Sequence, residues 1–293
     1  MVIHAEIQGI IGYLVTPFSD DGRINVHVLE TMINRLIDHG VHAIAPLGST
    51  GELAYLSNDE FRLVVDHCLS TVDQRIPVIV GVSGLTTANT IWRAQYAHEA
   101  GAQAIMVAPV TYWKLSEREI YQHYRSISEH VPIPIIAYNN PATAGIDMSP
   151  EFLVSMFETI DMVTMVKEST GDLNRMIQIA QLSGGQLPFY NGSNPLVLEA
   201  LRVGASGWCT AAPNLCPQQC QALYCAVMSN DFVTAQRIYD QLKPLLEFIV
   251  AGGLPATIKA GLNLLGIPAG SPRRPLLDLP AHEQDYLAKL LHQ

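Results

Sequence analysis

The amino-acid sequence predicts an α/β protein, a (β/α)8 TIM barrel with a C-terminal helical extension. Eight short apolar runs, rich in β-branched residues, alternate with longer segments of helical periodicity. The runs are apolar throughout, as expected for a parallel sheet that is buried on both faces. No Gly/Ser-rich linker or low-complexity tract divides the 293 residues, and barrels of this class commonly reach about 250 residues as one domain.

The predicted strands start 19 to 35 residues apart, over 10–16, 42–47, 77–82, 104–108, 133–138, 163–167, 187–190 and 206–210. The segments between them carry helix signals. Ser57 opens a helix that runs to about Thr71, and Thr86 precedes one that ends at Gly101. An open doubly wound sheet is the alternative, but it usually has a Gly-x-Gly-x-x-Gly turn after its first strand. Residues 16–20 read Thr-Pro-Phe-Ser-Asp instead.

Beyond the eighth strand the pattern changes. From Pro217 to the end no strand signal remains, and Gly252-Gly253 and the segment from Pro268 to Pro275 interrupt the chain. This part is expected to form several helices. We therefore predict a barrel over residues 1–216 and a helical extension over 217–293 that packs on the barrel.

Composition excludes several classes of partner. Acidic residues outnumber basic ones, 27 to 17, and the formal net charge is −10. Such a chain repels phosphate backbones and anionic membrane surfaces, and no apolar run approaches the ~20 residues that span a bilayer. Neither nucleic acid nor a membrane is expected as a partner. The first residues lack signal-peptide features and the five cysteines are sparse, so a cytoplasmic location with reduced thiols is expected.

Metal chemistry has little support in the sequence. Cys216 and Cys220 are one helical turn apart, but no Cys-x-x-Cys or His-x-x-x-His accompanies them. They are interpreted as small apolar residues of a helix. His39 and His42 flank the start of the second strand, at the barrel face opposite the expected site. No metal is predicted.

Active sites of such barrels lie at the carboxyl ends of the strands. Gly48 to Glu52, after the second strand, would present hydroxyl and N–H groups to a carboxylate or phosphate, although an ordinary helix cap gives the same pattern. Tyr138 ends the fifth strand, where it either fills the core or offers its hydroxyl to a substrate.

Lys167 ends the apolar sixth strand and is the most informative residue. Lysine is seldom buried without a reason, and desolvation lowers the pKa of its ammonium group. A neutral amine in a dry pocket attacks a carbonyl and forms a Schiff base. The alternative is a lysine that reaches the rim or pairs with Glu52 or Glu168. Lysine, tyrosine and the Ser/Thr segment together suit an α-keto acid.

Through the order of these residues, the chain resembles the dihydrodipicolinate synthase/N-acetylneuraminate lyase family of pyruvate-dependent class I aldolases. The likeness covers essentially the whole chain. No single motif is specific, but the ordered set is. It consists of Gly12 to Phe18, Gly48 to Glu52, Tyr138-Asn-x-Pro, Val166-Lys167-Glu168, Tyr190 to Ser193 and Leu254-Pro255-x-x-x-Lys259.

The resemblance implies roles for individual residues. Lys167 would form the imine, so that no separate cofactor is needed, and Tyr138 would relay protons. Ser49 and Thr50 would hold the carboxylate of pyruvate. A second catalytic tyrosine, lent across a dimer interface, would be Tyr112, one residue from the usual spacing. The remaining pocket residues would be Gly192 and Cys209, from strands seven and eight. A homo-oligomer, either a dimer or a homotetramer of dimers, is implied.

The second substrate depends on two departures from the family pattern. Thr143 stands where dihydrodipicolinate synthases carry an arginine, and Ser169 where they usually carry alanine. A hydroxyl does not replace a planar bidentate donor, so both changes favour a hydroxylated aldehyde or a 2-keto-3-deoxy sugar acid. Arg175 or an arginine of a partner subunit is the alternative source of a guanidinium. Asn58 and Phe61 replace the lysine-binding histidines of the family.

We therefore predict a Schiff-base carbon–carbon lyase or synthase that acts on pyruvate and a small aldehyde and resembles dihydrodipicolinate synthase. A 2-keto-3-deoxy sugar-acid aldolase or dehydratase of the same family is the alternative. A barrel that binds keto acids without turnover is the non-enzyme alternative, which the presence of both Lys167 and Tyr138 disfavours.

Overall fold

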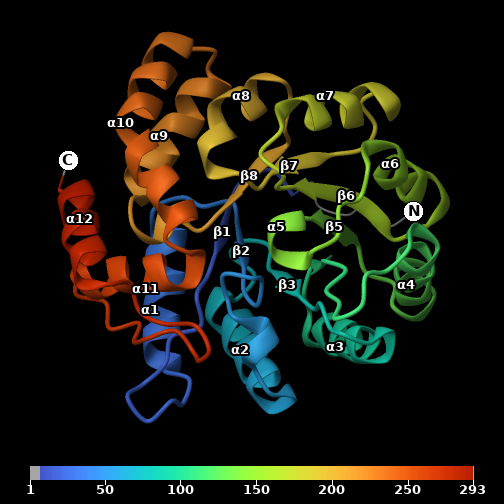
Figure 1. Cartoon of the computed structure of the whole chain (residues 1–293), viewed down its shortest axis with the longest axis horizontal. Coiled ribbons are helices and arrows are strands. Elements are labelled where there is room, and N and C mark those ends of the chain that lie inside the picture. The colour runs from blue at the N-terminus through green and yellow to red at the C-terminus, as the bar shows by residue number, and fades with distance from the viewer. Residues whose placement is uncertain (1–6, 293) are drawn as a thin grey trace.

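The computed structural model describes residues 7–292; residues 1–6, part of the segment on which the signal-peptide expectation rests, and residue 293 lie outside it. Eight parallel strands form one sheet in the order β2-β1-β8-β7-β6-β5-β4-β3. A parallel bridge between Ile44 and Val78 joins the two edges, so the sheet closes into the predicted barrel (Figure 1). The strands are β1 (Gly9–Tyr13), β2 (Ala43–Ala45), β3 (Ile79–Gly81), β4 (Ala104–Val107), β5 (Ile135–Asn139), β6 (Val163–Glu168), β7 (Phe189–Asn191) and β8 (Gly207–Thr210).

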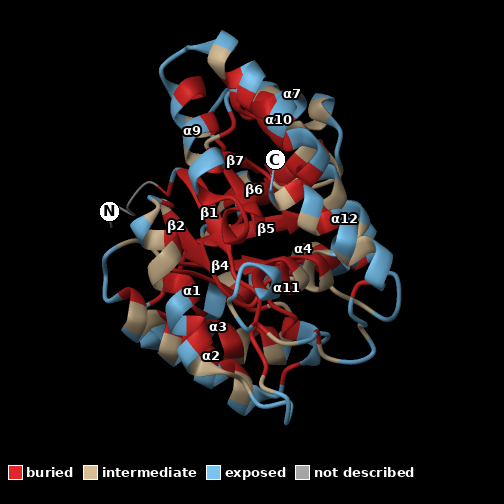
Figure 2. Cartoon of the chain, turned by 90° about the vertical axis from the view of Figure 1, so that its left-hand side faces the viewer, coloured by how far each residue is buried: buried red, intermediate tan, exposed pale blue. Residues whose placement is uncertain are grey.

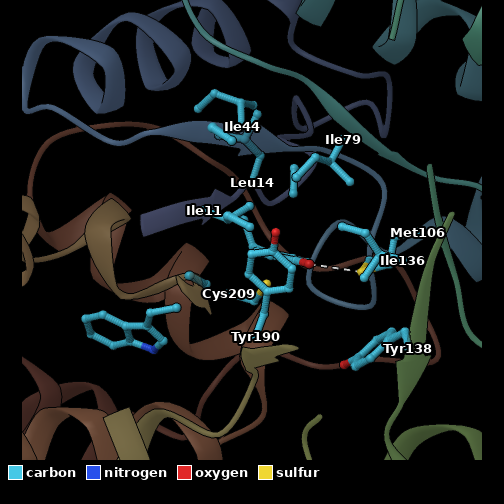
Figure 3. Close-up of a cluster of buried hydrophobic side chains, with 14 of the residues drawn as sticks. Ile11, Leu14, Ile44, Ile79, Met106, Ile136, Tyr138, Tyr190 and Cys209 are labelled. Carbon is cyan, nitrogen blue, oxygen red and sulfur yellow. Dashed lines mark hydrogen bonds between the residues drawn. The ribbon is translucent and has the colours of Figure 1, made fainter. Parts of the chain in front are cut away.

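The strands form the buried centre of the molecule, and the helices around them expose their outer faces (Figure 2). Inside the barrel, aliphatic side chains from neighbouring strands pack together, among them Ile11, Ile44, Ile79 and Ile136 (Figure 3). Burial on both faces explains why the strands read as continuous apolar runs. The bridge that joins the two edges of the sheet excludes the open sheet considered from the sequence.

The helices follow the strands and start at the predicted signals. Ser57 caps its helix with a complete capping box, because its hydroxyl accepts from the N–H of Glu60 and the Glu60 carboxylate accepts from its N–H. Gly101 ends a helix in the left-handed region at φ 101°. The barrel helices are α1 (Val26–Asp38), α2 (Asn58–Val72), α3 (Thr87–Ala100), α4 (Glu117–His130), α5 (Pro141–Ala144), α6 (Pro150–Thr159), α7 (Leu173–Leu182) and α8 (Val197–Arg202).

Four further helices follow β8: α9 (Pro217–Met228), α10 (Phe232–Ala251), α11 (Leu254–Leu264) and α12 (Ala281–Leu291). Helix α9 contacts α8 and β1, the neighbours that a helix after the eighth strand should have. We infer that α9 completes the eighth strand–helix unit and that the extension begins at α10. The predicted division at Pro217 stays a prediction.

A buried ion pair fastens the extension to the loop after β2. Lys259 Nζ of α11 lies 2.6 Å from a carboxylate oxygen of Glu52, and neither side chain is more than 1% exposed. The N–H of Arg273 donates to the other carboxylate oxygen of Glu52 at 2.6 Å. The guanidinium of Arg273 also pairs with Glu60 of α2 at 2.7 Å. These contacts connect the carboxyl-terminal part of the chain to the mouth of the barrel.

Candidate active site

A cavity of about 580 Å³ opens at the carboxyl ends of β2 to β5. The segments after these four strands form most of its wall. The extension closes another part with Leu254, Pro255 and Leu276. From the predicted site, the cavity is lined by Ser49, Tyr138 and Thr143.

Lys167 lies beside Tyr138 and Tyr190 in the barrel, because β6 pairs with β5 and β7 in that register. The residue is only 4% exposed. Its Nζ is 3.9 Å from the ring centroid of Tyr138 and 3.9 Å from that of Tyr13. Two aromatic faces thus surround the amine, and such contacts stabilise its charged form when it is desolvated.

Lys167 forms no ion pair with any residue from 7 to 292. The two carboxylates that could have paired with it are occupied elsewhere. Glu52 pairs with Lys259, and Glu168 lies 3.4 Å from Arg175. Glu168 follows Lys167 directly in β6, so its side chain points to the other face of the strand. The alternative of a paired or rim-exposed lysine does not describe this structure.

Gly192 makes the space in which the Lys167 side chain lies. A Cβ atom added to Gly192 would lie 2.7 Å from Lys167 Cε and 1.8 Å from Ser169 Oγ. No side chain fits there without displacing both neighbours. The Ser169 hydroxyl is itself buried and has no hydrogen-bond partner among the described residues. Its hydrogen-bonding capacity is therefore unused by the described residues.

The Tyr138 hydroxyl accepts a hydrogen bond from Asn140 Nδ2 at 2.7 Å. Burial by itself would raise the pKa of Tyr138. The charge of Lys167 and hydrogen bonds from Asn140, Ser49 and Lys167 outweigh that effect and lower the pKa below 10.0. A phenol with a lowered pKa gives up and takes back its proton more readily near neutral pH, as proton transfer in catalysis requires.

The Gly48–Glu52 segment has an unusual backbone that favours anion binding. Leu47 and Glu52 adopt positive φ angles of 62° and 59°. The N–H groups of Gly51 and Glu52 are used within the turn. Among residues 7–292, those of Ser49 and Thr50 have no acceptor. Free neighbouring N–H groups in a tight turn can bind a carboxylate. Ser49 also lines the cavity, whereas the Thr50 side chain is buried at 3% exposure.

The remaining predicted site residues lie in different surroundings. Cys209 is 2% exposed and lies among the buried side chains of the barrel shown in Figure 3. Tyr112 is 98% exposed and does not line the cavity of its own chain; the preceding Thr111 does. Arg175 binds Asp147, Glu168 and the carbonyl of Met148, so it is not available to replace the missing arginine at Thr143.

Three residues that contribute to the candidate active site were not identified from the sequence. The sequence presents Tyr13 as part of an apolar strand, although a tyrosine inside the first barrel strand is a signal in itself. Asn140 stands in the Tyr-Asn-x-Pro motif, which does not by itself indicate its hydrogen bond to Tyr138. The motif that contains Lys259 does not indicate its partner Glu52, because a contact across some 200 residues leaves no periodic pattern in a sequence.

Two other features considered from the sequence are a metal site and a membrane-spanning segment. Within residues 7–292, no three His, Cys, Asp or Glu side chains come together as metal ligands. Cys216 directly precedes α9 and Cys220 lies within it. Both are buried, and their sulfur atoms are 3.7 Å apart. The helices between residues 7 and 292 are all too short or too polar to cross a bilayer.

Comparison with known proteins agrees with this geometry. A putative dihydrodipicolinate synthetase from Pseudomonas aeruginosa is 53% identical, with a TM-score of 0.96 over 98% of this chain and 99% of that one. A pyruvate complex of the chloride-inhibited dihydrodipicolinate synthase from Acinetobacter baumannii is 28% identical, with a TM-score of 0.93 over 98% of both chains. The 4-hydroxy-tetrahydrodipicolinate synthase of Archaeoglobus fulgidus is 32% identical over 97% of each chain.

The family-level evidence covers almost every residue. The sequence model described as "Dihydrodipicolinate synthetase family" matches residues 6–293, a range that includes the whole barrel, the cavity and the extension. Together with a closed barrel and a buried lysine at the end of its sixth strand, this match confirms the predicted kind of enzyme, a lyase of the Schiff-base type: the chain belongs to the dihydrodipicolinate synthetase family.

Proposed function

We propose that this enzyme makes or breaks a carbon–carbon bond between C3 of pyruvate and the carbonyl carbon of a small aldehyde, through an imine on Lys167. One observation carries the proposal. The Lys167 amine is buried next to Tyr138, a residue of the cavity wall, and lies between the rings of Tyr13 and Tyr138 without a carboxylate partner among residues 7–292. A buried amine without a counter-ion is the nucleophile that carbonyl chemistry needs.

The proposed reaction begins with attack of neutral Lys167 Nζ on C2 of pyruvate. Tyr138 gives a proton to the resulting carbinolamine oxygen, which leaves as water, and the imine forms. The Tyr138 phenolate then takes a proton from C3, which gives an enamine. C3 of the enamine adds to the aldehyde carbon, and Tyr138 returns the proton to the aldehyde oxygen, which becomes a hydroxyl. Hydrolysis of the new imine releases the product and restores the lysine. The lowered pKa of Tyr138 supports its role in the proton transfers.

The carboxylate of pyruvate is proposed to bind the segment from Ser49 to Thr50. Their free backbone N–H groups support this role, as does the Ser49 hydroxyl at the cavity wall. The hydrogen bond between Ser49 and Tyr138 links this position to the proton relay. Thr50 would act through its N–H group, because its side chain is buried outside the cavity lining.

The imine is tested by treating the protein with pyruvate and borohydride and mapping the adduct by peptide mass. The expected result is a single reduced adduct on Lys167. An adduct on Lys114 or Lys259 instead, or no adduct at all, would refute the mechanism. Lys167→Met should give no adduct while keeping the circular dichroism spectrum of the native fold.

A second candidate is a 2-keto-3-deoxy sugar-acid aldolase or dehydratase that shares the imine step. The buried, unpartnered hydroxyl of Ser169 favours it, because a substrate hydroxyl would supply the missing hydrogen bond. Thr143 supports it as well, since the cavity offers a hydroxyl at that position in place of a guanidinium. A screen of pyruvate with acidic and hydroxylated aldehydes, reading the product by mass, separates the two candidates.

We also propose a homo-oligomer, a dimer or a tetramer of dimers, in which Tyr112 reaches the cavity of a partner subunit. Its 98% exposure and that of Trp113, at 80%, support a role at an interface. Sedimentation velocity tests the assembly. Tyr112→Ala should slow turnover if the tyrosine completes the partner's site, and should leave it unchanged if it does not.

A further inference from the structure

A buried arginine, Arg93, lines the same cavity and has no part in the chemistry proposed above. It lies on α3 and is 6% exposed. Its Nη1 donates to the carbonyl oxygen of Ser83 at 2.5 Å, and its guanidinium carbon lies 5.5 Å from the ring centroid of Phe61. Its Nε is buried and has no acceptor among the described residues. Arg93 therefore lines the cavity and carries a donor that no described residue uses.

The positive charge of Arg93 also lacks a partner. Among the described residues that line the cavity, Glu52 is the only acid and Arg93 the only base. The Glu52 carboxylate is already held by Lys259 and by the N–H of Arg273. Burial accordingly lowers the pKa of Arg93, with no acid nearby to raise it. A buried cation without an anion is unfavourable in the empty protein.

The surroundings of Arg93 suit an oxyanion. A guanidinium offers a planar fork of donors that matches a carboxylate. Asn89, one turn earlier on α3, lines the same cavity and carries an amide that can donate a further hydrogen bond. Leu85 and Val110 provide apolar wall between these groups, and a less polar environment strengthens a charged hydrogen bond.

We propose that Arg93 forms a second anion-binding position in this cavity, which takes a carboxylate and is separate from the Ser49–Thr50 position for pyruvate. This inference rests on the proposed function in one respect, the assignment of the Ser49–Thr50 position to the carboxylate of pyruvate. The carboxylate has two sources: the far end of the second substrate, or a separate small acid that regulates the enzyme. Both use the same chemistry at Arg93, and kinetics distinguishes them.

Binding is tested by isothermal titration calorimetry with succinate, and with its uncharged diamide as the control ligand. The protein carries Lys167→Met, so that no imine can form and the result does not depend on the proposed reaction. Adding Arg93→Met should weaken succinate by about 10- to 100-fold, the usual effect of losing a charged hydrogen bond. The diamide should bind far more weakly than succinate to the protein that retains Arg93.

Two matched variants separate binding from structure. Arg62→Met removes an exposed arginine of α2 that also stacks on an aromatic ring, 5.0 Å from Trp92, and should leave succinate affinity unchanged. Arg93→Met should keep or raise the urea midpoint, because it removes an uncompensated buried charge. A lower midpoint with unchanged succinate affinity would mean that Arg93 only supports the fold.

Kinetics on protein with Lys167 intact identifies the source of the carboxylate. If it belongs to the second substrate, Arg93→Met raises KM for succinic semialdehyde but not for butanal or pyruvate, and succinate competes with the acidic aldehyde. If it belongs to a regulator, succinate changes kcat at saturating aldehyde. Either result supports the site. Equal succinate affinity with and without Arg93, or equal affinity for the diamide, overturns it.

Discussion

At the scale of single residues, the chemistry of this site depends on how neighbouring groups set the protonation of Tyr138. Burial by itself would raise the pKa of the Tyr138 phenol. The charge of Lys167 and the hydrogen bond from Asn140 outweigh that effect and lower the pKa. The phenol therefore gives up its proton more easily than an ordinary tyrosine does. Tyr138 and the amine need to be considered as one unit.

Replacing Tyr138 with phenylalanine should lower kcat by roughly 10²- to 10⁴-fold, the usual contribution of a positioned acid–base group. The ring and its contact with Lys167 Nζ would remain. Tyr13→Phe is the matched control, because Tyr13 lies at the same 3.9 Å from the amine but donates its hydroxyl proton to Met106 Sδ. Near-native steady-state rates for Tyr138→Phe would show that Tyr138 only packs the core.

The same pKa shift predicts a pH dependence. Because the pKa of Tyr138 lies below 10.0, its proton is lost earlier as pH rises than from an ordinary tyrosine. The rate of imine formation with pyruvate should therefore begin to fall below pH 10. Stopped-flow measurements from pH 7 to 10.5 test this. The falling limb should be absent from Tyr138→Phe, whose residual rate has no phenol to titrate.

Substrate choice is also decided by single residues. A charged hydrogen bond is worth ~1.5–3 kcal/mol. With Thr143 in place of arginine, kcat/KM for aspartate semialdehyde should therefore be about 10- to 100-fold lower than in the same site with an arginine at position 143. Thr143→Arg should raise kcat/KM for aspartate semialdehyde by a similar factor. Arg175 does not compensate, since it is bound to Asp147 and Glu168. Arg93 of the same cavity compensates if the carboxylate proposed to bind there belongs to the second substrate, so the comparison is repeated with Arg93→Met. If aspartate semialdehyde is already the best substrate of the unmodified enzyme, the sugar-acid alternative is wrong.

At the scale of elements, the sequence predicted all eight strands because each is apolar on both faces. Their boundaries shifted by at most three residues, as at β1, where the predicted run 10–16 became Gly9–Tyr13. Hydrophobicity continues past the last ladder hydrogen bond, so it does not mark where pairing stops. Lys167 was predictable because it stands alone in an apolar run. Arg93 was not, since an arginine in a helix is normally on the exposed face.

The end of β7 predicts the effect of a single methyl group. In Gly192→Ala the new Cβ would lie 1.8 Å from Ser169 Oγ and 2.7 Å from Lys167 Cε. Overpacking of this kind typically costs about 1–3 kcal/mol. Borohydride trapping with pyruvate should be strongly reduced, because the lysine must move. Ser169→Ala in the same chain removes the closer of the two clashes and should restore part of the trapping; if it restores none, the clash with Lys167 itself is decisive.

At the scale of the whole molecule, the carboxyl-terminal extension takes part in building the site. Helices α10 to α12 lie together beside the barrel (Figure 1), and Leu254, Pro255 and Leu276 form part of the cavity wall. The extension is held through Lys259, Glu52 and Arg273, and Glu52 also ends the segment proposed to bind pyruvate. Sequence periodicity describes neighbours along a helix or strand, so this long-range arrangement could not be predicted from it.

This arrangement predicts that a substitution in the extension alters the binding of pyruvate at the active site. Lys259→Met leaves Glu52 charged and buried without its partner, which should lower the free energy of unfolding by about 3–5 kcal/mol in urea. The pyruvate position should loosen as well, so that KM for pyruvate rises while Tyr138 and Lys167 remain in place.

Adding Glu52→Gln removes the unpaired buried charge and should recover part of the stability. It should not recover the pyruvate KM, because the link between α11 and the Gly48–Glu52 segment is still broken. A pyruvate KM unchanged in both variants would show that the ion pair stabilises the fold alone and has no influence on the site.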